Sequence, residues 1–223
     1  MKNSVYSHQL VIYKIIKNLC TNKILYGIFR ILEEARWEYE YKRYREKYDI
    51  HPTFRFNGPG ITLYGNGKII LGENSYIGRY SSIQSVDGCI VKIGNNCAIS
   101  HYVMIYTANA VADQDFNKPR DQRKIKKGNV IIEDFCWIGA QTFITEGVNI
   151  GQNAAVVGAN SVVTKDIPPH SIAVGCPTKV IKFKSYLNDK DIIKLAKDYW
   201  NILHQNLKKH LLTQYEELNN LGD

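Results

Sequence analysis

The chain has 223 residues, of which 44% are apolar and 22% charged, and its net charge is +8. This is the composition of a folded domain with enough residues for a buried core, and it excludes a disordered or fibrous chain. The positive charge favours anionic partners, but it is not clustered with a recognition motif, so we expect no nucleic-acid partner. The five cysteines include no CxxC pair, which predicts reduced thiols and a cytoplasmic location.

Residues 1–50 are predicted to form an N-terminal helical extension, because apolar residues recur at spacings of three and four from Ile12 to Ala35. Lysines break the apolar run before it reaches the ~18 residues of a spanning helix, and they also break the apolar region of a signal peptide. These lysines are Lys14, Lys17 and Lys23. A basic amphipathic helix of this kind either makes peripheral contact with an anionic membrane surface or packs on its own domain or a neighbouring subunit.

From residue 71 onward an aliphatic residue recurs at every sixth position, apart from a few breaks in register. A period of six belongs to neither a helix nor a single strand; it predicts a triangular parallel β-helix whose coils stack at about 4.8 Å, here residues 51–186. The inward aliphatic positions are Leu71, Ile77, Ile83, Ile93, Ile99, Ile105, Ile132, Ile138, Ile144, Ile150, Val157 and Val163. Small or β-branched residues four positions later are expected near the turns: Ser75, Ser81, Cys97, Val103, Cys136, Thr142, Val148, Ala154 and Ser161.

The longest break in register is an inserted loop at residues 111–131. A long loop inside a compact repeat is typical of a functional segment, although a solvated insertion is the simpler alternative. Residues 187–223 are predicted to form one C-terminal helix from Asn188 to about Asn219, with Asn188 as its N-cap. We expect this helix to cap the prism or an assembly.

Stacking arithmetic places four residues in one column along a corner of the prism. Arg79, His101 and Ala140 each follow an inward residue by two positions in successive coils, and Ala159 follows Val157 in the same way if one extra residue is allowed. Alanines in the upper coils leave backbone amides uncovered, as a linear arm lying along the coils requires.

The segment Cys136-Trp137-Ile138-Gly139-Ala140 and the run from Val163-Thr164-Lys165 to Val180-Ile181-Lys182 resemble the hexapeptide-repeat acyltransferases, which have a left-handed β-helix. The resemblance covers about residues 58–182 and is strongest to sugar O-acetyltransferases of the galactoside, maltose and capsule type. It implies a homotrimer that uses acetyl-CoA, with active sites between adjacent subunits. It also implies CoA-binding residues, with lysines suited to phosphate: Trp137, Ala140, Ala159, Thr164, Lys165, Lys179 and Lys182.

Acyl transfer to a hydroxyl needs a base, and histidine is the natural group near neutral pH. Of the six histidines, only His101 combines an outward corner, the predicted column and proximity to the inserted loop, so we assign it as the catalytic residue. The alternative is a plain surface histidine. We assign acceptor binding to four residues: Arg79, Asn109, Asp113 and Asp115. The two aspartates would orient His101 or bind the acceptor, or they are ordinary solvated acids.

One departure from the resembled family bears on this assignment. Galactoside-type enzymes carry the catalytic histidine where this chain has about Asn109 to Asp113, and the inserted loop holds no histidine. Either His101 has taken the role or no histidine performs it. The sequence therefore favours an acetyl-CoA-dependent O-acetyltransferase acting on a carbohydrate hydroxyl, such as a surface-polysaccharide or sugar precursor.

The alternatives are an N-acetyltransferase of a nucleotide-linked amino sugar and a non-catalytic β-helix protein. Metal-dependent relatives of this fold need three converging histidines. Since His101 is the one histidine in the regular coils, we expect no metal.

Overall fold

The computed structural model describes residues 11–18, 22–156 and 158–221. The chain divides into two units, Met1–Arg43 and Tyr44–Asp223. The first unit contains helical residues 11–18 and most of helix α2 (Lys23–Lys47), which runs on into the second unit. Residues 1–10 and 19–21 of the predicted N-terminal extension lie outside the described residues.

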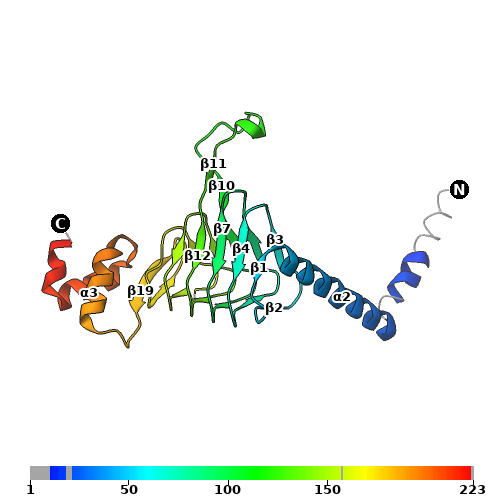
Figure 1. Ribbon diagram of the computed structural model, residues 1–223, viewed down its shortest axis with the longest axis horizontal. Coiled ribbons are helices and arrows are strands. Elements are labelled where there is room, and N and C mark those ends of the chain that lie inside the picture. The colour runs from blue at the N-terminus through cyan, green and yellow to red at the C-terminus, as the bar shows by residue number, and fades with distance from the viewer. Residues whose placement is uncertain (1–10, 19–21, 157, 222–223) are drawn as a thin grey trace. The chain divides into compact units, whose positions relative to one another are not determined.

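The second unit confirms the predicted parallel β-helix of hexapeptide repeats. Its short strands form three stacked faces (Figure 1). The first face consists of β1 (Asp49–Ile50), β4 (Lys68–Leu71), β7 (Ile90–Ile93), β12 (Val130–Ile132) and β15 (Asn149–Ile150). The second face consists of β2 (Arg55–Asn57), β5 (Tyr76–Gly78), β8 (Ala98–Ile99), β13 (Trp137–Ile138), β16 (Ala155–Val156), β18 (Ser171–Val174) and β19 (Lys179–Phe183). The third face consists of β3 (Thr62–Tyr64), β6 (Ser82–Gln84), β9 (Met104–Tyr106), β14 (Phe143–Ile144) and β17 (Val162–Val163).

The core is the column of aliphatic side chains inside the prism. The predicted inward positions in the described chain are all buried, at 0 or 1% exposure. Each lies in register with its counterparts in adjacent coils; Ile138, for example, pairs with Ile99 below it. Burying an isoleucine stabilises the fold by about 1.5–3 kcal/mol, so the repeat is cooperative: no coil covers its own inner face.

One predicted core position is wrong by a residue. Val156, not Val157, pairs with Ile138 and is fully buried, while Val157 lies outside the described residues. The extra residue of this coil therefore falls after Val156, on the way into the corner.

The predicted small residues are buried as well, and they carry hydrogen bonds between coils. The Ser75 hydroxyl donates to the Gly94 carbonyl at 2.7 Å and accepts from the backbone N–H of Cys97 at 2.8 Å. The Ser81 hydroxyl accepts from the backbone N–H of Val103 in the next coil at 3.0 Å. These bonds satisfy polar groups that the tight turns would otherwise leave buried without partners.

The chain turns between faces through single residues with left-handed backbone angles. At the first corner, between the first and second faces, three of them are asparagines: Asn74, Asn96 and Asn153, with φ of 53°, 54° and 57°. Asparagine tolerates this region better than most residues. The second corner, between the second and third faces, instead uses Tyr80 and Tyr102, with φ of 57° and 58°.

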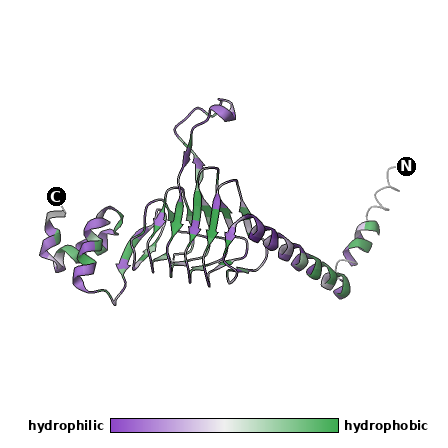
Figure 2. Cartoon of the chain, in the orientation of Figure 1, coloured by the Kyte–Doolittle hydropathy of each residue, from purple (hydrophilic) through white to green (hydrophobic). Residues whose placement is uncertain are grey.

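The inserted segment predicted as a loop at residues 111–131 contains regular structure. Strands β10 (Ala108–Ala110) and β11 (Ile125–Lys127) pair antiparallel, and a 3₁₀ turn, η1 (Arg120–Gln122), lies between them. This hairpin projects from the third corner, between the third and first faces (Figure 1). Its residues are mostly hydrophilic (Figure 2).

The C-terminal segment forms two α-helices and not the single helix that was predicted. These are α3 (Asp189–Asp198) and α4 (Gln205–Gln214), with 3₁₀ turns η2 (Trp200–Ile202) and η3 (Glu216–Leu221). Asn188 is the N-cap as predicted, its side chain accepting from Asp191 N at 3.0 Å. The helix is interrupted because Leu203 bridges to Val180 of β19 and His204 N donates to the Val180 carbonyl at 2.7 Å.

Candidate active site

The second corner brings together the four residues predicted to form a column. Tyr102 N donates to the Arg79 carbonyl at 3.0 Å, and Gln141 N donates to the His101 carbonyl at 2.9 Å. Asn160 N donates to the Ala140 carbonyl at 3.3 Å, which repeats the same step one coil higher. Ala159 therefore stands above Ala140 even though the strands pair Ile138 with Val156.

The column changes character from the lower coils to the upper ones. Arg79 and His101 are exposed, whereas Ala140 is half-buried and Ala159 is exposed with no side chain beyond Cβ. The His101 imidazole leans on the coil below, where a Cβ at Gly78 would collide with its Nδ1. Within the described chain no side-chain hydrogen bond engages this ring. The corner thus presents an exposed imidazole beneath two alanines.

Two tyrosines flank His101 and were missed by the sequence reasoning. Tyr80 and Tyr102 stack with ring centroids 5.4 Å apart and planes at 22°, and both are nearly half exposed. They occupy the left-handed positions directly after Arg79 and His101. The sequence does contain a pattern that could have identified them, because a tyrosine directly follows the column residue in two successive coils.

The third corner holds a second polar group, centred on Glu146. The side chain of Glu146 is only 7% exposed. Its Oε2 accepts a hydrogen bond from the Asn109 amide, and its Oε1 lies 3.1 Å from Lys126 Nζ. Burial raises the pKa of Glu146, but the hydrogen bonds from Asn109 and the backbone and the charge of Lys126 outweigh it, so the pKa lies below its ordinary value.

Sequence reasoning assigned Asn109 to the acceptor and did not single out Glu146. The signal for Glu146 is its place in the repeat. It follows Ile144 by two residues, as the fully buried Ser85 and Thr107 follow their own inward isoleucines. A carboxylate at such a position needs partners, and the hairpin supplies them, because Asn109 and Lys126 face each other across its two strands.

The expected proximity of His101 to the inserted loop is not found within one subunit. His101 lies at the second corner, the hairpin leaves the third corner, and β9 spans the face between them. Asp113 and Asp115 are exposed in the hairpin, and the Asp115 carboxylate accepts from Asn117 N at 2.9 Å. Neither aspartate orients His101 of the same chain.

The residues assigned to CoA are likewise distributed over the prism. Trp137 is 52% exposed on the second face, and Thr164 and Lys165 are exposed at the third corner. Lys182 is exposed on β19, while Lys179 is half-buried with Nζ 3.4 Å from the Asn201 carbonyl. Within one chain, therefore, Ala140 and Ala159 lie at the second corner, whereas Thr164 and Lys165 lie at the third.

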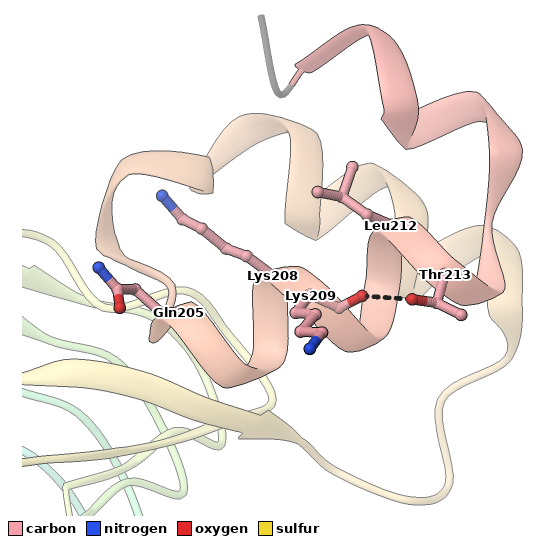
Figure 3. Close-up of a pocket in the computed structure, with 5 residues that line it drawn as sticks. All are labelled: Gln205, Lys208, Lys209, Leu212 and Thr213. Atoms are coloured by element: carbon pink, nitrogen blue, oxygen red, sulfur yellow. Dashed lines mark hydrogen bonds between the residues drawn. The ribbon is translucent and has the colours of Figure 1, made fainter.

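One hollow lies away from both corners. It is a shallow depression of about 370 Å³ on α4 (Figure 3). Its lining residues are Gln205, Lys208, Lys209, Leu212 and Thr213. None of the predicted site residues lines it. Among the described residues no cluster of three or more histidines, cysteines, aspartates or glutamates has metal-binding geometry.

Comparison with known proteins identifies relatives of the prism. Residues 129–165 match the family described as "Hexapeptide repeat of succinyl-transferase". A galactoside O-acetyltransferase of Escherichia coli K12 is 36% identical over 132 residues, which are 57% of this chain and 62% of that protein. WbbJ of the same organism, named for O-acetyl transfer in lipopolysaccharide biosynthesis, is 33% identical over 134 residues, covering 56% of this chain and 67% of that protein.

A solved structure of a maltose O-acetyltransferase from Clostridium difficile 630 superposes with a TM-score of 0.56 at 28% identity. The match covers 74% of this chain and 91% of that chain. The chain spans about three fifths of the length of the galactoside enzyme.

Proposed function

Because this chain belongs to the hexapeptide-repeat acetyltransferases, we propose that it is a homotrimeric, cytoplasmic O-acetyltransferase that moves the acetyl group of acetyl-CoA to a carbohydrate hydroxyl. The observation that carries the proposal is the second-corner column, where an exposed histidine lies in line with two alanines. The names of two relatives, for galactoside and for lipopolysaccharide, support a sugar or surface-glycan acceptor.

The column suits a thioester donor. The pantetheine arm would lie along the corner beside Ala140 and Ala159, where no side chain extends past Cβ. Exposed ammonium groups at Lys165 and Lys182 suit the phosphates of the nucleotide. These residues fit coenzyme A chemically, provided that two subunits contribute them.

His101 would act as the general base. Its neutral imidazole takes the proton of the acceptor hydroxyl as the oxygen attacks the thioester carbonyl. The new C–O bond forms, the C–S bond breaks, and the proton passes to the departing thiolate, so that CoA leaves as the thiol. Arg79, one coil below, would bind the acceptor, and the stacked rings of Tyr80 and Tyr102 line this corner.

Assembly explains why the assigned residues occupy different corners. In a ring of three identical subunits each contact joins two different surfaces, so a corner of one subunit meets another corner of its neighbour. The second corner of one prism would then face the third corner and hairpin of the next, which carry Asp113, Asp115 and the Thr164-Lys165 pair. The complete active site is therefore an intersubunit site.

The test is thiol release by His101→Ala with hydroxyl and amino-sugar acceptors. We expect kcat to fall by roughly 10²–10⁴ on hydroxyl acceptors, with little change in KM for acetyl-CoA. His210→Ala, which changes an exposed histidine on α4, is the matched control and should retain full activity.

Two results contradict the assignment. Near-normal turnover of an amino sugar by His101→Ala would identify an N-acetyltransferase, because a deprotonated amine already has a free lone pair. Unchanged turnover of a hydroxyl acceptor by the same variant would remove His101 from the chemistry.

A further inference from the structure

The N-terminal helical segments expose apolar side chains in unusual number. No residue of α2 is buried. The large apolar side chains at about half exposure or more within residues 11–32 are Val11, Ile12, Tyr13, Ile15, Ile16, Ile24, Tyr26, Ile28, Phe29, Ile31 and Leu32. Large exposed apolar patches on a protein mark interaction sites. We refer to residues 11–32 as the basic apolar segment.

Helical spacing gathers the isoleucines of the segment on one side of each helix, while Tyr26 lies on the same side as Arg30. In α2, Ile24, Ile28 and Ile31 lie on one side of the helix, since residues three and four apart share a face. Arg30 lies on the opposite side and pairs with Glu34. In residues 11–18 the apolar pairs at 11–12 and 15–16 share one side, and Lys14 lies on the other. Apolar residues of this segment alternate with hydrophilic ones in Figure 2.

The charge of the segment is of one sign. Residues 1–32 include five basic residues and no acidic residue; the basic residues are Lys2, Lys14, Lys17, Lys23 and Arg30. Acidic residues begin at Glu33, and the remainder of α2 mixes both signs, as in the pair of Arg43 with Glu40. The exposed apolar side chains and the excess of basic residues therefore fall in the same stretch of sequence.

The combination of exposed apolar side chains and basic residues indicates which kind of partner binds this segment. A bundle of identical helices would bury the apolar sides but bring the basic residues of each copy toward one another. An anionic lipid surface receives the apolar side chains and attracts the basic ones at the same time. No helix in the described part of the chain is long and apolar enough to cross a membrane, so the segment would lie in the interface.

We propose that the basic apolar segment binds the surface of an anionic phospholipid membrane and holds the protein there. Tyr13, Tyr26 and Phe29 then provide rings at the level of the headgroups, where aromatic side chains are favoured. The binding needs no catalytic residue and does not depend on the proposed acetyl transfer.

Co-sedimentation of the full-length protein with vesicles tests the proposal. The vesicles are phosphatidylcholine alone, or phosphatidylcholine mixed with phosphatidylglycerol. We expect binding to the anionic vesicles only, weakened by added salt. A basic side chain near such a surface contributes about fivefold to partitioning, so Lys14→Gln with Lys23→Gln should weaken binding by about 25-fold. Ile28→Gln with Ile31→Gln should abolish it.

Two control variants match these changes outside the segment. Tyr39→Gln alters an exposed apolar residue later in α2, and Lys68→Gln alters an exposed lysine of β4. Both should bind as the wild type does. Failure of the wild type to bind anionic vesicles would overturn the proposal. So would a change in oligomeric state of the isoleucine variant, by light scattering without lipid, because the apolar face would then join copies of this chain.

Discussion

Replacing Asn109 by alanine tests whether the buried carboxylate of Glu146 ties the hairpin to the prism. The change removes the amide that donates to Glu146 Oε2, while the carboxylate stays 7% exposed and poorly reached by water. A hydrogen bond to a charged group contributes about 1.5–3 kcal/mol. Lys126 cannot compensate, because its side chain is 66% exposed and an exposed ion pair contributes only about 0–1 kcal/mol. We expect Asn109→Ala to lower the free energy of unfolding by about 2 kcal/mol, and Lys126→Ala by less than about 1 kcal/mol.

The stability cost of Asn109→Ala should depend on pH, because the hydrogen bond that it removes is accepted by a carboxylate. The pKa of Glu146 is lower in the folded protein than its ordinary value, so the unfolded chain binds the proton more tightly. The stabilisation is complete above the ordinary carboxyl pKa and is lost as pH falls through the folded pKa. The cost of Asn109→Ala should accordingly stay constant from about pH 7 down to the ordinary carboxyl pKa of about 4.3, and shrink only as the pH falls below it.

Urea unfolding at a fixed protein concentration measures the cost of Asn109→Ala and its pH dependence. The change in the urea midpoint is converted into a free energy of unfolding through the denaturant slope. Asn117→Ala is the control, because it removes an exposed asparagine amide from the same hairpin. A cost for Asn109→Ala no larger than that of Lys126→Ala would refute the reasoning. So would a cost that is equal at neutral pH and at a pH well below the ordinary carboxyl pKa.

Three further outcomes are expected. Ala140→Trp fills the second corner and should raise the Kd for CoA about tenfold or more, by calorimetric titration, while Lys190→Trp on α3 leaves it unchanged. Ile138→Ala removes a fully buried side chain and should cost about 2–5 kcal/mol in urea unfolding, against about 0.5–1.5 for Ile138→Val; equal costs would contradict a close-packed core. Light scattering should give the mass of a trimer at all concentrations, and a stable monomer would rule out the intersubunit site.

The six-residue period determined the fold by itself. Each hexapeptide has to place one aliphatic side chain inside the prism, so the core residues recur at a fixed interval in the sequence. Ile77, Ile99 and Ile138 are stacked as their spacing requires. The column of Arg79, His101 and Ala140 follows from the same arithmetic. The N-cap at Asn188 is also local, because it depends only on residues three positions apart.

Spacing alone does not decide between apolar neighbours. Val156 and Val157 both satisfy an apolar pattern, and only the pairing of Val156 with Ile138 places the extra residue after Val156. The break between α3 and α4 is of the same kind: the apolar stripe continues through Leu203, but that residue bridges to Val180 at the edge of the prism. Backbone hydrogen bonds to distant residues decide both cases.

The polar group at the third corner belongs entirely to the tertiary structure. Glu146 is distant in sequence from Asn109, and neither carries a local motif; the hairpin and the stacked coils bring them into contact. The sequence likewise assigned His101 and the hairpin aspartates to one site, whereas a whole face of the prism separates them in each chain. Sequence spacing places residues along the repeat, because one side chain per hexapeptide must point inward. Which corners come together, and which buried charge finds a partner, depends on how the coils and the hairpin pack.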